Sequence, residues 1–152
     1  MESGDVLGGV GGGVKGLYVL VLRVEEGVYR IGRLYHGRLP GGYYVYVGSA
    51  WGPGGLKARI SRHLRRDKKP RWHIDWLTVS SRVRVVDVYV LPGYRDEGRL
   101  ASILSEAGEC PVRGFGSSDD PGNECHLFYL GSSKEVFEDL IGSMEWRIIR
   151  LG

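Results

Sequence analysis

The sequence contains few cysteines, Cys110 and Cys125 being the only two. They could pair with each other, but free thiols are the usual state inside most cells, hyperthermophiles excepted, so the sequence leaves their bonding open. Together with His126 they offer three metal ligands without a Cys-x-x-Cys spacing, whereas structural zinc is held by four ligands. We therefore expect no zinc site.

Long hydrophobic runs are also missing. The longest apolar stretches, such as VVDVYVL, are much shorter than the ~20 residues that a membrane-spanning helix requires. The segment MESGDVLGGV lacks the basic residues and apolar stretch of a secretory signal, and GGGVKG lacks the Gly-Lys-Ser/Thr ending of a phosphate-binding P-loop. These absences predict a cytoplasmic protein without a membrane partner.

The chain length of 152 residues suits one domain with a substantial core. Residues 1–15 are rich in glycine and lack hydrophobic periodicity, which predicts a flexible arm. Residues 16–152 contain no repeat and no linker, so we expect a single folded domain there.

The hydrophobic pattern of this domain predicts an α+β fold with a small, largely antiparallel central sheet flanked by about three helices. Strands are expected at residues 16–24, 27–39 (with a turn), 41–49, 83–91 and 126–130. Helices are expected from Leu56 to Leu64, over residues 96–108, and near Ser132, where Ser132 and Glu135 would form a capping box. The segment WHIDWL receives no assignment.

The positive charge is concentrated in LKARISRHLRRDKKPRW, although the net charge of the chain is only +3. Such a cluster suits a polyanion, and nucleic-acid phosphate is the commonest one. A solvated helix face is an equally good interpretation of the charges alone. The candidate nucleic-acid-binding residues are Lys57, Arg62, Arg65, Arg66, Lys68, Lys69, Arg71 and His73.

Several side chains combine residue types that support chemistry. Tyr46 lies on one face of its expected strand, and Tyr18 begins the first strand. Arg59 and His63 are four residues apart and therefore share one side of a helix. Arginine binds phosphate oxygens, and histidine exchanges protons near neutral pH, although core or rim packing would explain each residue separately.

Glu97 lies on the apolar face of the second expected helix, where a charged carboxylate is unusual and requires an explanation. A favourable interaction with the helix dipole would be one reason. Coordination of a hard cation such as Mg²⁺ would be another. Gly16, Gly48 and Ser49 are interpreted as turn residues, and the small Gly48 and Ser49 would let a phosphate approach Tyr46.

In its tyrosines, Arg-x-x-x-His helix and later glutamate, the sequence resembles the GIY-YIG nuclease superfamily. Gly16-Leu17-Tyr18 and Tyr46-Val47-Gly48 would stand for the two halves of that name. More closely, YVYVGSA, RISRHLRRDKKPRWHIDWL, GFGSSD and HLFY are similar to a poorly characterised, mainly archaeal branch of the superfamily. Domains of that branch sometimes occur joined to DNA-repair glycosylases of the endonuclease III type. The long interval between Tyr18 and Tyr46 implies an extra strand between the two tyrosine motifs.

The resemblance implies a metal-dependent endonuclease that hydrolyses phosphodiester bonds in DNA, in repair or recombination. It assigns catalysis to Tyr18, Tyr46, Arg59 and His63, and one Mg²⁺ or Mn²⁺ ion to Glu97. It also implies DNA as a partner and a possible association with a DNA-repair protein. The alternative is a catalytically inactive nucleic-acid-binding module, or an interaction domain of a DNA-repair complex.

Overall fold

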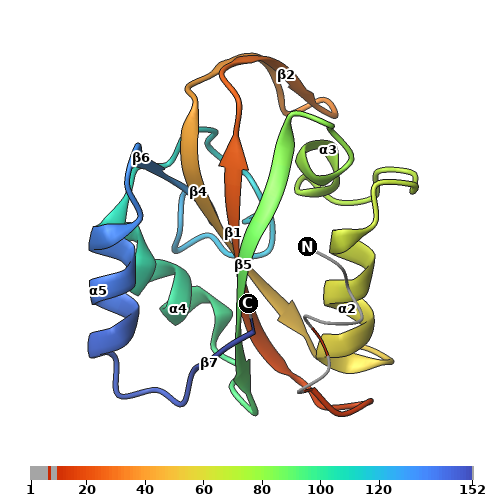
Figure 1. Cartoon of the computed structure of the whole chain (residues 1–152), viewed down its shortest axis with the longest axis vertical. Coiled ribbons are helices and arrows are strands. Elements are labelled where there is room, and N and C mark those ends of the chain that lie inside the picture. The colour runs from red at the N-terminus through yellow and green to blue at the C-terminus, as the bar shows by residue number, and fades with distance from the viewer. Residues whose placement is uncertain (1–6, 8–9, 152) are drawn as a thin grey trace.

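The computed structural model describes Leu7 and residues 10–151 (Figure 1). The predicted flexible arm therefore falls mostly on residues outside the described ones. Within it, Leu7 and Val10 are buried in the hydrophobic core, and the Val14 carbonyl accepts a hydrogen bond from the amide of Leu56. The described part of the arm thus packs against the folded domain.

A five-stranded antiparallel sheet forms the centre of the molecule, in the order β6-β4-β1-β5-β7. Its strands are β1 (Gly16–Val24), β4 (Gly42–Ala50), β5 (Val83–Pro92), β6 (Leu127–Gly131) and β7 (Ile149–Arg150). The central position of β1 explains its composition: eight of its nine residues are buried, since it has a strand on each side and helices on both faces. The predicted α+β class and antiparallel sheet are confirmed.

The chain between the two tyrosine motifs forms two strands rather than one. β2 (Gly27–Ile31) and β3 (Tyr35–Leu39) pair with each other as a separate two-stranded sheet. Gly32, with φ of 49°, begins the turn that joins them, a conformation that glycine adopts without strain. The extra strand predicted here is therefore a hairpin that stands apart from the central sheet.

Helices cover both sides of the sheet, with α2 and α3 on one side of the strands and α4 and α5 on the other (Figure 1). They are α2 (Gly55–Leu64), α3 (Asp75–Thr78), α4 (Glu97–Leu104), followed by the 3-10 turn η1 (Ser105–Ala107), and α5 (Glu135–Ser143). α3 is the segment that received no assignment from the sequence. None of the helices within the described residues has the length and apolar character needed to cross a membrane.

Two local predictions are wrong. Gly16, Gly48 and Ser49 lie within strands β1 and β4 rather than in a turn, because β4 continues to Ala50. The capping box expected at Ser132 is absent from the start of α5, where the Ser133 hydroxyl accepts the hydrogen bond from the amide of Glu135 instead.

A disulfide joins Cys110 and Cys125, whose Cα atoms are 6.0 Å apart. The sequence alone left open whether these two cysteines pair with each other. The bond closes the segment that leads from η1 to β6 and carries the GFGSSD motif.

Candidate functional site

Tyr18 and His63 are joined by a hydrogen bond between the phenol oxygen and Nε2, at 2.6 Å. Both side chains are about 1% exposed. The ring of Tyr18 lies over Gly48, its neighbour in the β1–β4 pairing, and a Cβ on Gly48 would overlap the phenol. The small size of Gly48 thus makes room for Tyr18, which corrects the expectation that this space would admit a phosphate.

Tyr46 lies beside this pair. Its ring centroid is 6.4 Å from that of Tyr18 and 6.1 Å from that of His63. On its other side it contacts Phe115 edge-on and faces Gly116, where a Cβ would lie 3.1 Å from the tyrosine ring. The GFGSSD motif therefore forms one wall of the tyrosine site.

Burial keeps these groups in their neutral forms. Burial raises the pKa of Tyr18 well above its usual value, and it likewise raises the pKa of Tyr46. Burial, together with the nearby charge of Lys68, lowers the pKa of His63 to about 3. At neutral pH the site thus contains two phenols and an uncharged imidazole, so His63 acts as a hydrogen-bonding partner of Tyr18 rather than as a cation.

Arg59 supplies the positive charge of the site. Its charge lowers the pKa of both Tyr18 and Tyr46, against the larger effect of burial. The Arg59 guanidinium lies over the ring of Trp72, 4.4 Å from its centroid. Because a guanidinium stacked on an indole keeps its N–H groups free at the edge, this contact orients Arg59 without using its hydrogen-bond donors.

Glu97 is the first residue of α4. Its negative charge raises the pKa of Tyr18 and of Tyr46, and for Tyr46 it is the strongest charge effect. Tyr18, Tyr46, Arg59 and Glu97 therefore share one electrostatic environment. The structure gives no direct contact between the Glu97 carboxylate and either phenol.

A buried histidine holds the Glu97 carboxylate. His126 is 2% exposed; its Nδ1 lies 3.3 Å from Glu97 Oε2, and its Nε2 lies 2.7 Å from Asp120 Oδ2. Burial opposes the charged form, but the two carboxylates outweigh it and raise the pKa of His126. Asn123 donates to Asp120 and to the carbonyl of Gly98, which ties this cluster to α4.

The carboxylate of Glu97 suits a hard cation bound mostly by water and substrate. Its side chain is 31% exposed, and only Oε2 contacts His126. Mg²⁺ commonly binds one or two protein carboxylates together with waters and substrate phosphates. Within the described part of the chain, no group of three or more His, Cys, Asp or Glu side chains could hold a metal ion by itself. The donor set therefore fits a weakly held, substrate-assisted ion.

The predicted nucleic-acid-binding residues fall into two groups. The side chain of Lys68 is 3% exposed, and its Nζ donates to the carbonyls of Arg62 and His63 at the end of α2. Arg66 donates to the carbonyls of Ser80 and Val83. These two cations stabilise the fold and are not free to follow a phosphate backbone. Apart from Arg66, the residues of the set that are exposed are Lys57, Arg65, Lys69 and Arg71.

Asp75 neutralises part of this charge. It is fully buried, pairs with Arg62 at 3.0 Å, and accepts the amides of Arg71 and Trp72. Burial disfavours the carboxylate, but these hydrogen bonds and the charge of Lys68 keep the pKa of Asp75 low. The guanidinium of Arg62 is therefore partly engaged by Asp75 and only partly available to a phosphate.

His73 has a role inside the protein, since its Nδ1 accepts a hydrogen bond from the amide of Gly116. It thereby links the segment before α3 to the GFGSSD motif. Sequence reasoning did not identify Trp72 or His126 as parts of the site. The signal for Trp72 was its place in an arginine-rich segment, where its ring also stacks with Arg62 and Arg71.

The sequence of the chain matches, over residues 17–148, the family described as domain of unknown function DUF123. The chain belongs to this family. The match runs from before Tyr18 to beyond His126, so the whole candidate site lies within the DUF123 domain. Comparisons with curated proteins and with solved structures find no match.

Proposed function

We propose that this DUF123 domain is a metal-dependent nuclease of the GIY-YIG type that cleaves phosphodiester bonds in DNA. The observation that carries the proposal is the cluster of Tyr18, Tyr46 and His63, whose ring centroids lie 5.3 to 6.4 Å apart and whose two phenols are both within reach of the charges of Arg59 and Glu97. A phosphodiester bound between the Arg59 guanidinium and the Glu97 carboxylate would have a cation beside it to stabilise its negative charge. The two phenol hydroxyls next to it would hold and orient an attacking water. The resemblance to the archaeal branch supports repair or recombination as the setting.

The residues of the chain would divide the work as follows. Arg59, oriented by Trp72, would bind a non-bridging oxygen and stabilise the charge that grows there. Tyr18 would hold the attacking water, while His63, behind the phenol and neutral, fixes the position of its hydroxyl proton. Tyr46 would orient the same water or the phosphate. A divalent ion on Glu97 would supply further charge neutralisation at the phosphate and leaving oxygen.

The basic face of α2 and the loop after it would hold the DNA backbone. The exposed cations Lys57, Arg65, Lys69 and Arg71 are the candidates, and contacts of this kind position a duplex without reading its sequence. The same cations favour the second candidate function, a nucleic-acid-binding module without hydrolysis.

Cleavage assays separate the two functions. Purified protein is incubated with duplex, flap, bubble and branched DNA in Mg²⁺ or Mn²⁺, and we expect nicking that stops in chelator. Glu97→Ala and Arg59→Ala should each reduce cleavage by about 10²-fold or more, whereas the exposed Glu106→Ala serves as a matched control on the neighbouring turn. Salt-dependent binding that survives Glu97→Ala, with no cleavage of any substrate by the parent protein, would replace the nuclease with the binding module.

A further inference from the structure

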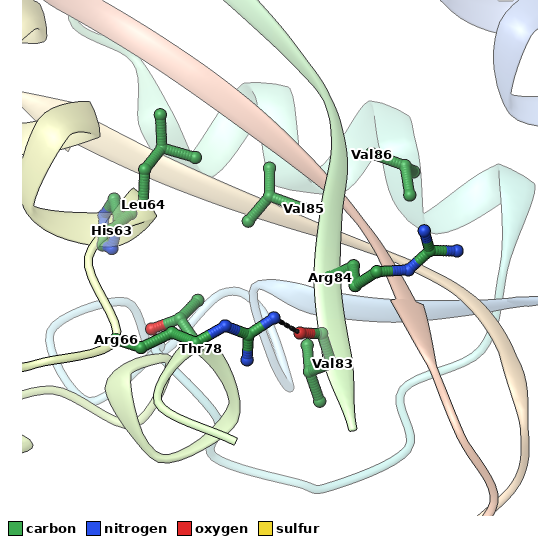
Figure 2. A pocket seen from close by; sticks show the side chains of 8 residues that line it. All are labelled: His63, Leu64, Arg66, Thr78, Val83, Arg84, Val85 and Val86. Atoms are coloured by element: carbon green, nitrogen blue, oxygen red, sulfur yellow. Dashed lines mark hydrogen bonds between the residues drawn. The ribbon is translucent and has the colours of Figure 1, made fainter. Parts of the chain in front are cut away.

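A groove of about 390 Å³ lies between the end of α2, α3 and the first half of β5 (Figure 2). None of the exposed cations proposed above for DNA binding lines it; it shares His63 with the candidate site and Arg66 with the fold-stabilising cations. Its lining residues are His63, Leu64, Arg66, Thr78, Val83, Arg84, Val85 and Val86. We call it the β5 groove.

The β5 groove follows the edge of a strand. In Figure 2, Val85 points toward α2, whereas Arg84 and Val86 point to the other side of the ribbon. Successive side chains of a strand project to opposite faces, so a cavity lined by both sets must run along the strand edge. The pairing of β1 with β5 shifts register at this point, so that Leu22 faces Val85 and Val21 faces Asp87.

This edge of β5 has no partner strand over residues 83–87 within the described chain. β7 pairs only with Tyr89 and Val90, and the amide of Leu151 donates to Val88. The guanidinium of Arg66 donates a hydrogen bond to the carbonyl of Val83 on this edge. Because outward-facing backbone groups recur every second residue, Val85 presents its N–H and C=O on the same edge as Val83.

The lining of the groove is apolar and positively charged. Leucine and valine side chains form its walls, Arg66 and Arg84 are exposed, and none of the eight lining residues is acidic. His63 also lines the groove, and its buried Nδ1 has no hydrogen-bond partner among the residues that the structure describes. The groove therefore offers apolar surface, unpaired backbone groups and cations together.

We propose that the β5 groove binds an extended acidic peptide segment of a partner protein. The segment would pair with the free edge of β5, the same edge that β7 occupies further along the strand. Backbone hydrogen bonds to Val85 would give the segment its register. Alternate side chains would enter the space between Leu64 and Val85, and an acidic side chain would pair with Arg84. A nucleic acid fits less well, because the lining contains no phenylalanine, tyrosine or tryptophan ring on which a base could stack, and the ring of His63 is buried.

The probe is a fluorescein-labelled peptide of about eight residues that alternates valine and glutamate, long enough to span the free edge. Binding is measured by anisotropy, and the amide of Val85 is followed by NMR shift and hydrogen exchange. We expect binding that shifts and protects this amide. Arg84→Glu should weaken it about fivefold, and Val85→Pro, which removes the edge N–H, should abolish it.

Arg33→Glu is the matched control, because Arg33 is an exposed arginine in the β2–β3 turn and its reversal changes the net charge equally. It should leave peptide affinity unchanged. If Val85→Pro does not fold, hydrogen exchange at Val85 in the parent protein decides. The proposal is overturned if the peptide does not bind, binds without protecting Val85, or binds Arg84→Glu as well as the parent. It is also overturned if an oligodeoxythymidine perturbs Val85 and the peptide does not. Glu97→Ala should not affect peptide binding, which separates this proposal from the nuclease.

Discussion

The phenol ring of Tyr18 occupies the space that a side chain at position 48 would fill. Gly48→Ala should therefore displace Tyr18 and break its hydrogen bond to His63. We expect a loss of about 1–3 kcal/mol in the free energy of unfolding, the usual effect of overpacking a core. Chemical denaturation measures it. Gly142→Ala in α5 is the control, since a Cβ there meets open space and should stabilise the helix by about 0.5–1 kcal/mol. Equal stability of the two variants would contradict the packing argument.

Acid should destabilise the protein through His63. Its folded pKa of about 3 lies below the usual value of 6.5, so the unfolded chain binds the proton first. The stability that the neutral imidazole retains at pH 7 is lost as the pH falls from about 6.5 toward 3, by up to about 1.4 kcal/mol per pH unit. His126, whose pKa is raised, acts in the opposite direction. The difference in the free energy of unfolding between pH 7 and pH 5 should therefore be smaller in His63→Asn than in the parent protein. An equal difference in the two proteins would refute the low pKa assigned to His63.

Asp75→Asn should destabilise the fold strongly. The substitution removes the charge that pairs with Arg62 and Lys68, and it can place an amide donor against the amides of Arg71 and Trp72. Breaking such a buried pair reduces the free energy of unfolding by about 3–5 kcal/mol. Asp67→Asn, on the exposed surface nearby, should change it by less than about 0.5 kcal/mol. Thermal unfolding of both variants gives the comparison.

Reduction of the disulfide should lower stability without changing the fold class. The closed segment between Cys110 and Cys125 has a sequence separation of 15, for which chain entropy predicts about 3 kcal/mol. Cys110→Ser/Cys125→Ser should reproduce the effect of a reductant on the parent protein. A reductant that lowers the melting temperature of the double variant as well would point to another cause.

Nucleic-acid binding should distinguish the two groups of cations. Arg65→Ala should reduce the salt dependence of DNA binding by about one phosphate contact, a slope change of about 0.9, with little change in stability. Lys68→Ala should instead destabilise the end of α2, because the Lys68 amine donates to two carbonyls there. Binding titrations at several salt concentrations, beside unfolding curves, test both statements. If Lys68→Ala changed the salt dependence of DNA binding and Arg65→Ala changed only the stability, the division of the cations into a DNA-binding and a fold-stabilising group would be wrong.

Much of the fold could be predicted because its strands carry strong local signals. β1, β4 and β5 are β-branched and aromatic runs, and α2 has apolar residues at helical spacing. The four-residue helix α3 has no such signal, since Asp75 reaches back to the amides of Arg71 and Trp72 at its start. Its formation depends on contacts that the pattern of the sequence does not contain.

The candidate site was partly predictable for the same reason. Arg59 and His63 are neighbours on one helix, and their proximity follows from spacing alone. The contact of His126 with Glu97 requires the chain between α4 and β6 to fold back, which no local pattern encodes. The sequence likewise reports the charges of Arg66 and Lys68 but not the carbonyls that bind them.

The central place of β1 also restricts the order in which the chain can become stable during synthesis. β1 precedes its partners β4 and β5 along the chain, and these end only at Ala50 and Pro92. Until β5 has emerged, an apolar strand with one unpaired edge is exposed, which is the usual starting point for aggregation. A chain that stops before Val83 would keep that edge unpaired, so β1 cannot have a partner on both sides until β5 has been synthesised.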